Sequence, residues 1–87
     1  MSECLITSRG ATRARAMAVA IASAGLPARV VRPPADVSRE GCGYAVAIAQ
    51  QLVGQAAEVL RAAHMPPRRI YCVGADGRYT EEKGYGA

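Results

Sequence analysis

The sequence predicts an α+β fold of the ferredoxin-like type, a βαββαβ sandwich with a four-stranded antiparallel sheet and two helices on one face. Two observations predict it. Four short apolar runs have the length and composition of strands, and two longer segments repeat apolar side chains every three or four residues, as amphipathic helices do. Right-handed crossovers then place the third strand between the first and the second.

The first half of the chain supplies a strand, a helix and a second strand. Residues 4–8 are a short apolar run that ends in polar residues, which indicates a buried strand. The spacing of apolar side chains predicts a helix over residues 11–24, and Gly25 is typical of the position just beyond a helix end. A β-branched pair predicts the second strand over residues 28–32, before two prolines.

The second half supplies a strand, a helix and a last strand. Residues 43–49 alternate larger side chains with alanine, and this period of two favours a strand, although the alanine content leaves a helix open. An apolar stripe from about residue 50 predicts the second helix, which a proline pair ends, and a strand follows at 69–73. An Asp-Gly turn signal comes next. Residues 1–76 thus form one predicted domain, and residues 77–87 are a predicted flexible tail.

Composition limits the class of partner. The 87 residues are enough for one small domain, and the net charge of +4, with ten arginines among the 11 basic residues, favours acidic partners in general. Readers of single-stranded nucleic acid interleave aromatic with basic side chains, and this chain has four Tyr, no Phe and no Trp. No apolar run is long enough to span a bilayer. We therefore expect neither nucleic acid nor membrane as a partner.

The three cysteines, Cys4, Cys42 and Cys72, are odd in number and widely spaced. This pattern argues against a disulfide framework and a structural zinc site, and it favours a reducing cytoplasm. Cys4 and Cys72 are predicted to be buried thiols in strands. An export signal over residues 9–24 is the weaker interpretation, because an acidic and apolar segment precedes its basic part.

The chain is organised around the loop 32–43, which joins the second and third predicted strands. Two prolines stiffen the start of the loop by fixing φ. Gly41 and Gly43 flank Cys42 and leave its thiol sterically open, which is how a reactive cysteine is presented. The alternative is a turn that happens to contain a cysteine.

The predicted topology brings this loop to the end of the sheet where the first strand ends at Ser8 and the first helix begins. The end of the second helix is expected there too. Ser8 or Thr12 could cap the first helix. The positive end of that helix, together with Arg9, Arg13 and the loop residue Arg39, favours a thiolate and so lowers the expected pKa of the loop cysteine. Two acidic side chains in the loop act in the opposite direction.

A resemblance rests on residues 34–43, Pro-Ala-Asp-Val-Ser-Arg-Glu-Gly-Cys-Gly, and on the strand and helix after them. This stretch resembles the signature of the selenium/sulfur carrier protein-like family, and the resemblance spans roughly residues 4–73. The chain departs from the signature at Ala35, where the family has arginine, and in one extra residue between Ser38 and Cys42. Arg39 is a candidate to replace that arginine. The most specific matches are Pro34, Val37, Ser38, Cys42 and Gly43.

The resemblance implies a carrier and not an enzyme. Cys42 would accept sulfur or selenium, as a persulfide or selenosulfide, from a donor of the cysteine desulfurase or selenocysteine lyase type and pass it to an acceptor protein. No metal is expected, and no cofactor other than the covalently carried chalcogen. The alternative is a non-catalytic module that binds a ligand or a protein on the same scaffold. The predicted site comprises the carrier Cys42 and the supporting residues Gly41, Gly43, Ser38, Arg39, Ser8 and Arg13.

Overall fold

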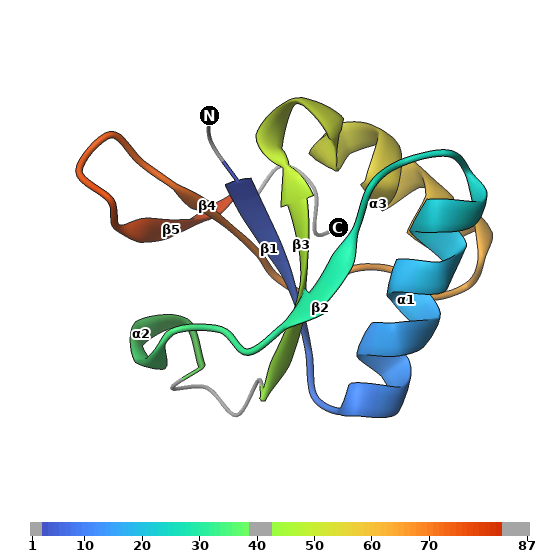
Figure 1. The fold of residues 1–87 in the computed structure, drawn as a ribbon, viewed down its shortest axis with the longest axis horizontal. Helices are drawn as coiled ribbons and strands as arrows, with labels where there is room; N and C mark the ends of the chain where they lie inside the picture. The colour runs from blue at the N-terminus through green and yellow to red at the C-terminus, as the bar shows by residue number, and fades with distance from the viewer. Residues whose placement is uncertain (1–2, 39–42, 83–87) are drawn as a thin grey trace.

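A computed structural model of the chain describes residues 3–38 and 43–82, except for the side chains of Asp36 and Ser38 (Figure 1). The described elements follow one another as β1 (Glu3–Ser8), α1 (Ala11–Ser23), β2 (Arg29–Val31), α2 (Ala35–Ser38), β3 (Tyr44–Ala49), the 3-10 turn η1 (Gln50–Leu52), α3 (Val53–Ala62), β4 (Ile70–Val73) and β5 (Tyr79–Glu82). The two long helices and the first four strands lie where the sequence predicts them. The segment 43–49, for which a helix was left open, is a strand.

The strands form one sheet in the order β2-β3-β1-β4-β5, in which all neighbouring pairs are antiparallel. As predicted, β3 lies between β1 and β2. The prediction of four strands is wrong, because β5 pairs with β4 along the edge. The predicted Asp76-Gly77 turn closes this hairpin: Gly77 has a φ of 80°, and the Gly74 N–H donates to the carbonyl of Arg78 at 2.8 Å.

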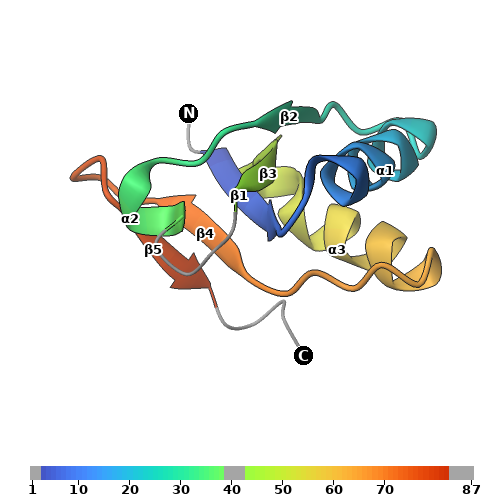
Figure 2. The same ribbon diagram turned by 90° about the horizontal axis from the view of Figure 1, so that it is seen from below.

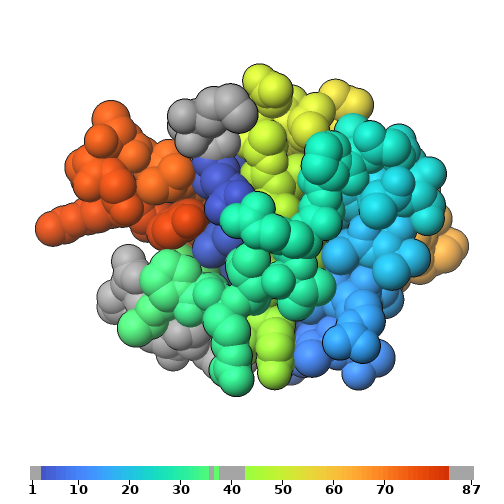
Figure 3. Space-filling model, viewed as in Figure 1, coloured from blue at the N-terminus to red at the C-terminus, as the bar shows by residue number. Residues whose placement is uncertain are grey.

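The fifth strand lies in the predicted C-terminal tail. Residues Tyr79–Glu82, which fall in the predicted flexible tail, are hydrogen-bonded strand. Their side chains are polar apart from Tyr79, so they carry no apolar run, and pairing with β4 defines the strand. The turn of the β4–β5 hairpin projects from the body of the molecule (Figure 3).

The helices α1 and α3 cover one face of the sheet, as predicted (Figure 2). The main core lies between that face and the helices, and its large, fully buried side chains include Ile6, Met17, Ile21, Ile48 and Leu60. On the other face, Leu5, Ala45 and Ala47 form a smaller buried cluster. The strand β3 is therefore buried on both faces, which explains why its smaller side chains are alanine.

The loop between β2 and β3 contains a short helix, α2, which the sequence did not predict. This helix lies on the side of the sheet opposite α1 and α3 (Figure 2). Its Val37 side chain is buried, and the Val37 N–H donates to the carbonyl of Pro34 at 3.0 Å. The start of the loop is thus fixed by proline stiffness and by burial of one apolar side chain.

Both long helices end in left-handed residues. Gly25 follows α1 as predicted, with a φ of 84°, and glycine adopts this conformation without steric cost. The helix α3 ends before the predicted proline stop, because His64 takes the same position with a φ of 61°. The Met65 N–H then donates to the carbonyl of Leu60 at 2.8 Å, which turns the chain back toward the sheet.

Candidate functional site

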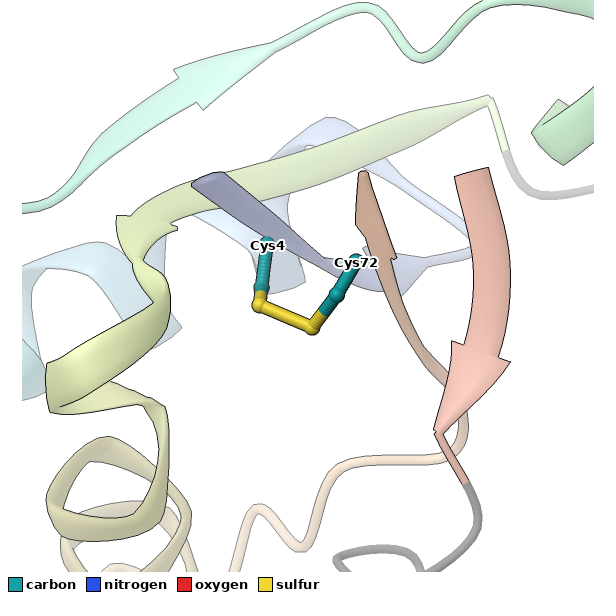
Figure 4. The surroundings of a disulfide bond; sticks show 2 residues. All are labelled: Cys4 and Cys72. Carbon is teal, nitrogen blue, oxygen red and sulfur yellow. A yellow bond between two sulfur atoms is a disulfide. The ribbon is translucent and has the colours of Figure 1, made fainter. Parts of the chain in front are cut away.

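Two of the three cysteines are bonded to each other. Cys4 of β1 and Cys72 of β4 are directly opposite in the sheet register, and their sulfur atoms are 2.02 Å apart (Figure 4). Both side chains belong to the core on the helix-covered face, with exposed fractions of 0% and 3%. The prediction of two separate buried thiols is correct about burial and wrong about the bond.

The spacing of the cysteines could not reveal this bond, since 68 positions separate the two residues and only the register of β1 against β4 aligns them. The expected lack of a disulfide was one reason to predict a reducing cytoplasm. Cytoplasmic localisation therefore stays a prediction. Within residues 3–38 and 43–82, no helix is both long and apolar enough to cross a membrane. The same residues contain no group of three His, Cys, Asp or Glu side chains that could hold a metal ion.

The opposite end of β1 opens into a pocket of about 180 Å³. It is formed where β1 ends, α1 begins and the connection from α3 to β4 passes by. We call this hollow the arginine pocket. Its lining residues are Thr7, Ser8, Arg9, Arg13, Met17, Pro66 and Arg68.

The turn from β1 into α1 positions the first two arginines of the pocket. The hydroxyl of the buried Ser8 donates to the carbonyl of Gly10 at 3.0 Å, and Gly10 is the N-cap of α1. Among the described residues no side chain caps this helix, so the prediction that Ser8 or Thr12 does so is wrong: the Ser8 hydroxyl donates to a carbonyl. The first turn of α1 therefore has N–H groups without a side-chain partner and contains no acidic residue.

Arg68, the third arginine of the pocket, was not predicted. The backbone N–H and the hydroxyl of Thr7 both donate to the carbonyl of Arg69, at 3.0 and 3.1 Å, and so tie the connection before β4 to the end of β1. This anchor places Arg68 on the rim. The sequence signal was the Pro-Pro-Arg-Arg run after the second helix, but its path depends on the left-handed turn at His64.

Two arginines of the described residues form ion pairs with glutamates, and the three pocket arginines are not among them. Arg29 is 3.0 Å from the carboxylate of Glu3, and Arg61 is 3.0 Å from that of Glu58. Within the described part of the chain, no ion pair joins Arg9, Arg13 or Arg68 to a carboxylate, and all three are exposed. Among the described residues, the pocket is therefore lined by three positive charges and by no carboxylate.

Gly43 brings the cysteine loop to this end of the sheet. Ser8 pairs with Tyr44 in the register of β1 and β3, so Gly43 lies beside Arg9. A Cβ atom built on Gly43 would be 4.0 Å from the carbonyl oxygen of Arg9, which is ordinary contact, and the φ of Gly43 is not left-handed. The backbone therefore does not require glycine here.

The predicted site residues lie partly within the described part of the chain. Ser8, Arg13 and Gly43 lie at the same end of the sheet, as expected from the topology. Ser38 is the last residue of α2, and its side chain is not described. The remaining three, Arg39, Gly41 and Cys42, lie outside the described residues, as does the predicted effect on the pKa of Cys42.

Comparisons with known proteins give one match. No curated protein and no solved structure matches the chain. A sequence model of the family described as "Putative Se/S carrier protein-like" matches residues 3–72, from the start of β1 to the second cysteine of the disulfide. Since this match covers most of the chain, the protein belongs to the Se/S carrier protein-like family.

Proposed function

We propose that this protein is a small sulfur or selenium carrier that holds the chalcogen on Cys42 and passes it to a partner. The family match supports the class of function. The observation that carries the proposal is the position of Gly43 beside Arg9, which lines the arginine pocket, while Cys4 and Cys72 are bonded together in the core. Cys42, which directly precedes Gly43, is thus the one cysteine outside that bond.

The transfer step is a thiol exchange. The Cys42 thiolate attacks the terminal sulfur of a persulfide on a donor enzyme of the cysteine desulfurase type, or the selenium of a selenosulfide on a selenocysteine lyase type. A bond forms between Cys42 and the transferred atom, and the bond from that atom to the donor cysteine breaks. The donor sulfur leaves as a thiolate, so one thiolate replaces another without net oxidation. Attack by an acceptor thiolate repeats the exchange.

The arginine pocket suits both states of such a carrier. Arg9 and Arg13 line the pocket, and their positive charge would stabilise a Cys42 thiolate and so lower the expected pKa of that cysteine. The terminal anion of a persulfide extends farther than a thiolate, and Arg39 of the same loop would offset its charge. Gly41 and Gly43 would leave room for the added atom. The proposal needs no resident metal, cofactor or catalytic triad.

We also infer that the scaffold is a ferredoxin-like sandwich with one added strand. The first four strands follow the spatial order β2-β3-β1-β4, with two helices on one face, and β5 adds a strand at the edge. On this scaffold the crossovers bring the end of β1 and the start of β3 together, and these ends flank the proposed carrier loop.

Loading by a donor enzyme tests the proposal. The protein is incubated with a cysteine desulfurase and cysteine, or with a selenocysteine lyase and selenocysteine, and intact mass is followed over time. We expect one added sulfur or selenium atom on the wild type and none on Cys42→Ser. The matched control is Cys4→Ala/Cys72→Ala, which removes the other two cysteines and should still load.

Two variants separate a carrier from a merely reactive thiol. Arg39→Ala should shorten the lifetime of the loaded form more than it changes alkylation of the unloaded thiol, because the persulfide anion reaches farther from the loop. Loading that survives Cys42→Ser, or no uptake from either donor, would contradict the proposal. The non-catalytic binding module would then be the better account.

A further inference from the structure

We propose that the arginine pocket is a binding site for a small tetrahedral oxyanion of the phosphate or sulfate class. The proposal goes beyond chalcogen transfer, because it uses described residues of the pocket and no cysteine. Arg9, Arg13 and Arg68 come from three separate segments, and all line the same hollow. Each presents a planar, permanently charged group that donates several hydrogen bonds and fits phosphate or carboxylate oxygens.

Charge balance is the first argument. Like charges that line one small hollow repel each other, and the repulsion is relieved when an anion lies between them. Two arginines elsewhere, Arg29 and Arg61, each have a glutamate 3.0 Å away. Around the pocket, the described residues provide arginines without such glutamates. A bound dianion would supply the missing charge.

The backbone at the pocket is the second argument. The helix α1 begins between Arg9 and Arg13 of the pocket lining, and it has 13 residues of aligned peptide dipoles, no side-chain cap at Gly10 and no acidic residue in the first turn. The N–H groups at such a start are donors for an anion. Ser8 leaves these donors unused, because its hydroxyl donates to the Gly10 carbonyl. The positive end of the helix and the arginines that line the pocket thus favour an anion in the same region.

The size of the pocket selects a small ligand. Its volume of about 180 Å³ is below the roughly 300–1,000 Å³ of pockets that enclose drug-sized molecules. The hollow therefore suits a small ion of a few heavy atoms better than a larger organic ligand. The Thr7 bonds to the Arg69 carbonyl hold the rim in place before any ligand binds.

Titration of the full chain by NMR tests the proposal. Sodium sulfate and inorganic phosphate are added at constant ionic strength, with sodium chloride as the balancing salt, and amide shifts of residues 8–14 are followed. We expect saturable shifts with both oxyanions and about tenfold weaker affinity for Arg68→Gln, since one charge-assisted contact is lost. The matched control is Arg15→Gln, an exposed arginine of α1 that does not line the pocket, which should change affinity less than about twofold.

The source of the oxyanion is identified by a third ligand. Phosphoserine that binds as tightly as inorganic phosphate would support a site for a phosphate group on a monoester, whereas weaker binding of phosphoserine would support the free ion. Shifts that do not saturate, or equal weakening by Arg15→Gln and Arg68→Gln, would overturn the proposal, because they would reflect net charge alone. Cys42→Ser should bind both oxyanions as the wild type does, so a failure of chalcogen loading and a failure of this site are distinguishable.

Discussion

At its amino end, strand β1 holds Cys4 in the core, bonded to Cys72 and covered by the helices, whereas at its carboxyl end it runs into Ser8 and Arg9 on an open pocket. At the first end, the sulfur atoms of Cys4 and Cys72 are bonded and buried, so they are withheld from solvent and from thiol exchange. At the second end, Arg9 lies beside Gly43, the residue after the third cysteine, and forms no ion pair with a described carboxylate. The bonded sulfur atoms thus lie at one end of β1, and Gly43, the residue after the cysteine proposed for transfer, lies beside the other end.

The largest effect on stability is expected at the amino end of β1, where Cys4 is bonded to Cys72. Replacing both bonded cysteines, as Cys4→Ala/Cys72→Ala, should lower the free energy of unfolding by ~4 kcal/mol, because a bond across 68 positions restricts the unfolded chain strongly. Urea unfolding of the oxidised wild type and of the variant measures this. Cys42→Ser is the control and should leave the midpoint unchanged. Equal midpoints for the wild type and the double variant would show that the bond does not stabilise the fold.

A smaller loss of stability is expected at the carboxyl end of β1, where Thr7 donates to the connection before β4. Thr7→Val keeps the size of the side chain but removes the hydroxyl that donates to the carbonyl of Arg69. The Thr7 N–H still donates to that carbonyl, so the loss of unfolding free energy should be about 1 kcal/mol. Thermal unfolding compares it with Thr12→Val, an exposed position of α1. A loss no greater than that of Thr12→Val would mean that Thr7 does not fix the pocket rim.

The smallest effect on stability is expected at Gly43. Since its φ is not left-handed and a Cβ atom would make only a 4.0 Å contact, Gly43→Ala should change the unfolding free energy by less than about 0.5 kcal/mol. Gly25→Ala, at a φ of 84°, should cost about 1 kcal/mol or more and serves as the comparison. Slower chalcogen loading of Gly43→Ala at unchanged stability would show that Gly43 provides space and not backbone freedom. Loading at the wild-type rate would remove Gly43 from the proposed site.

Much of the fold followed from local periodicity. The alternation over β3 and the helical stripes predicted the layers, because burial on a sheet face or a helix face imposes those periods. The strand β5 escaped prediction because its polar residues are ordered by pairing with β4 and not by their own burial. The disulfide escaped because it depends on register, which the sequence of either strand alone does not contain.

The candidate site was predictable only in part. Ser8, Arg13 and Gly43 were expected at one end of the sheet, because crossover rules bring the end of β1 and the start of β3 together. Arg68 was not expected there. Its position depends on the left-handed turn at His64 and on the Thr7 anchor, and both are tertiary features of a short connection.

The most direct test of this account is a map of iodoacetamide adducts on the native, unreduced protein at limiting reagent. The account predicts a single adduct, on Cys42, and adducts on Cys4 and Cys72 only after reduction and unfolding, because these two sulfur atoms are bonded and buried. Labelling of Cys4 or Cys72 in the native protein, or a Cys42 that stays unlabelled, would contradict the separation of structural and transferable sulfur.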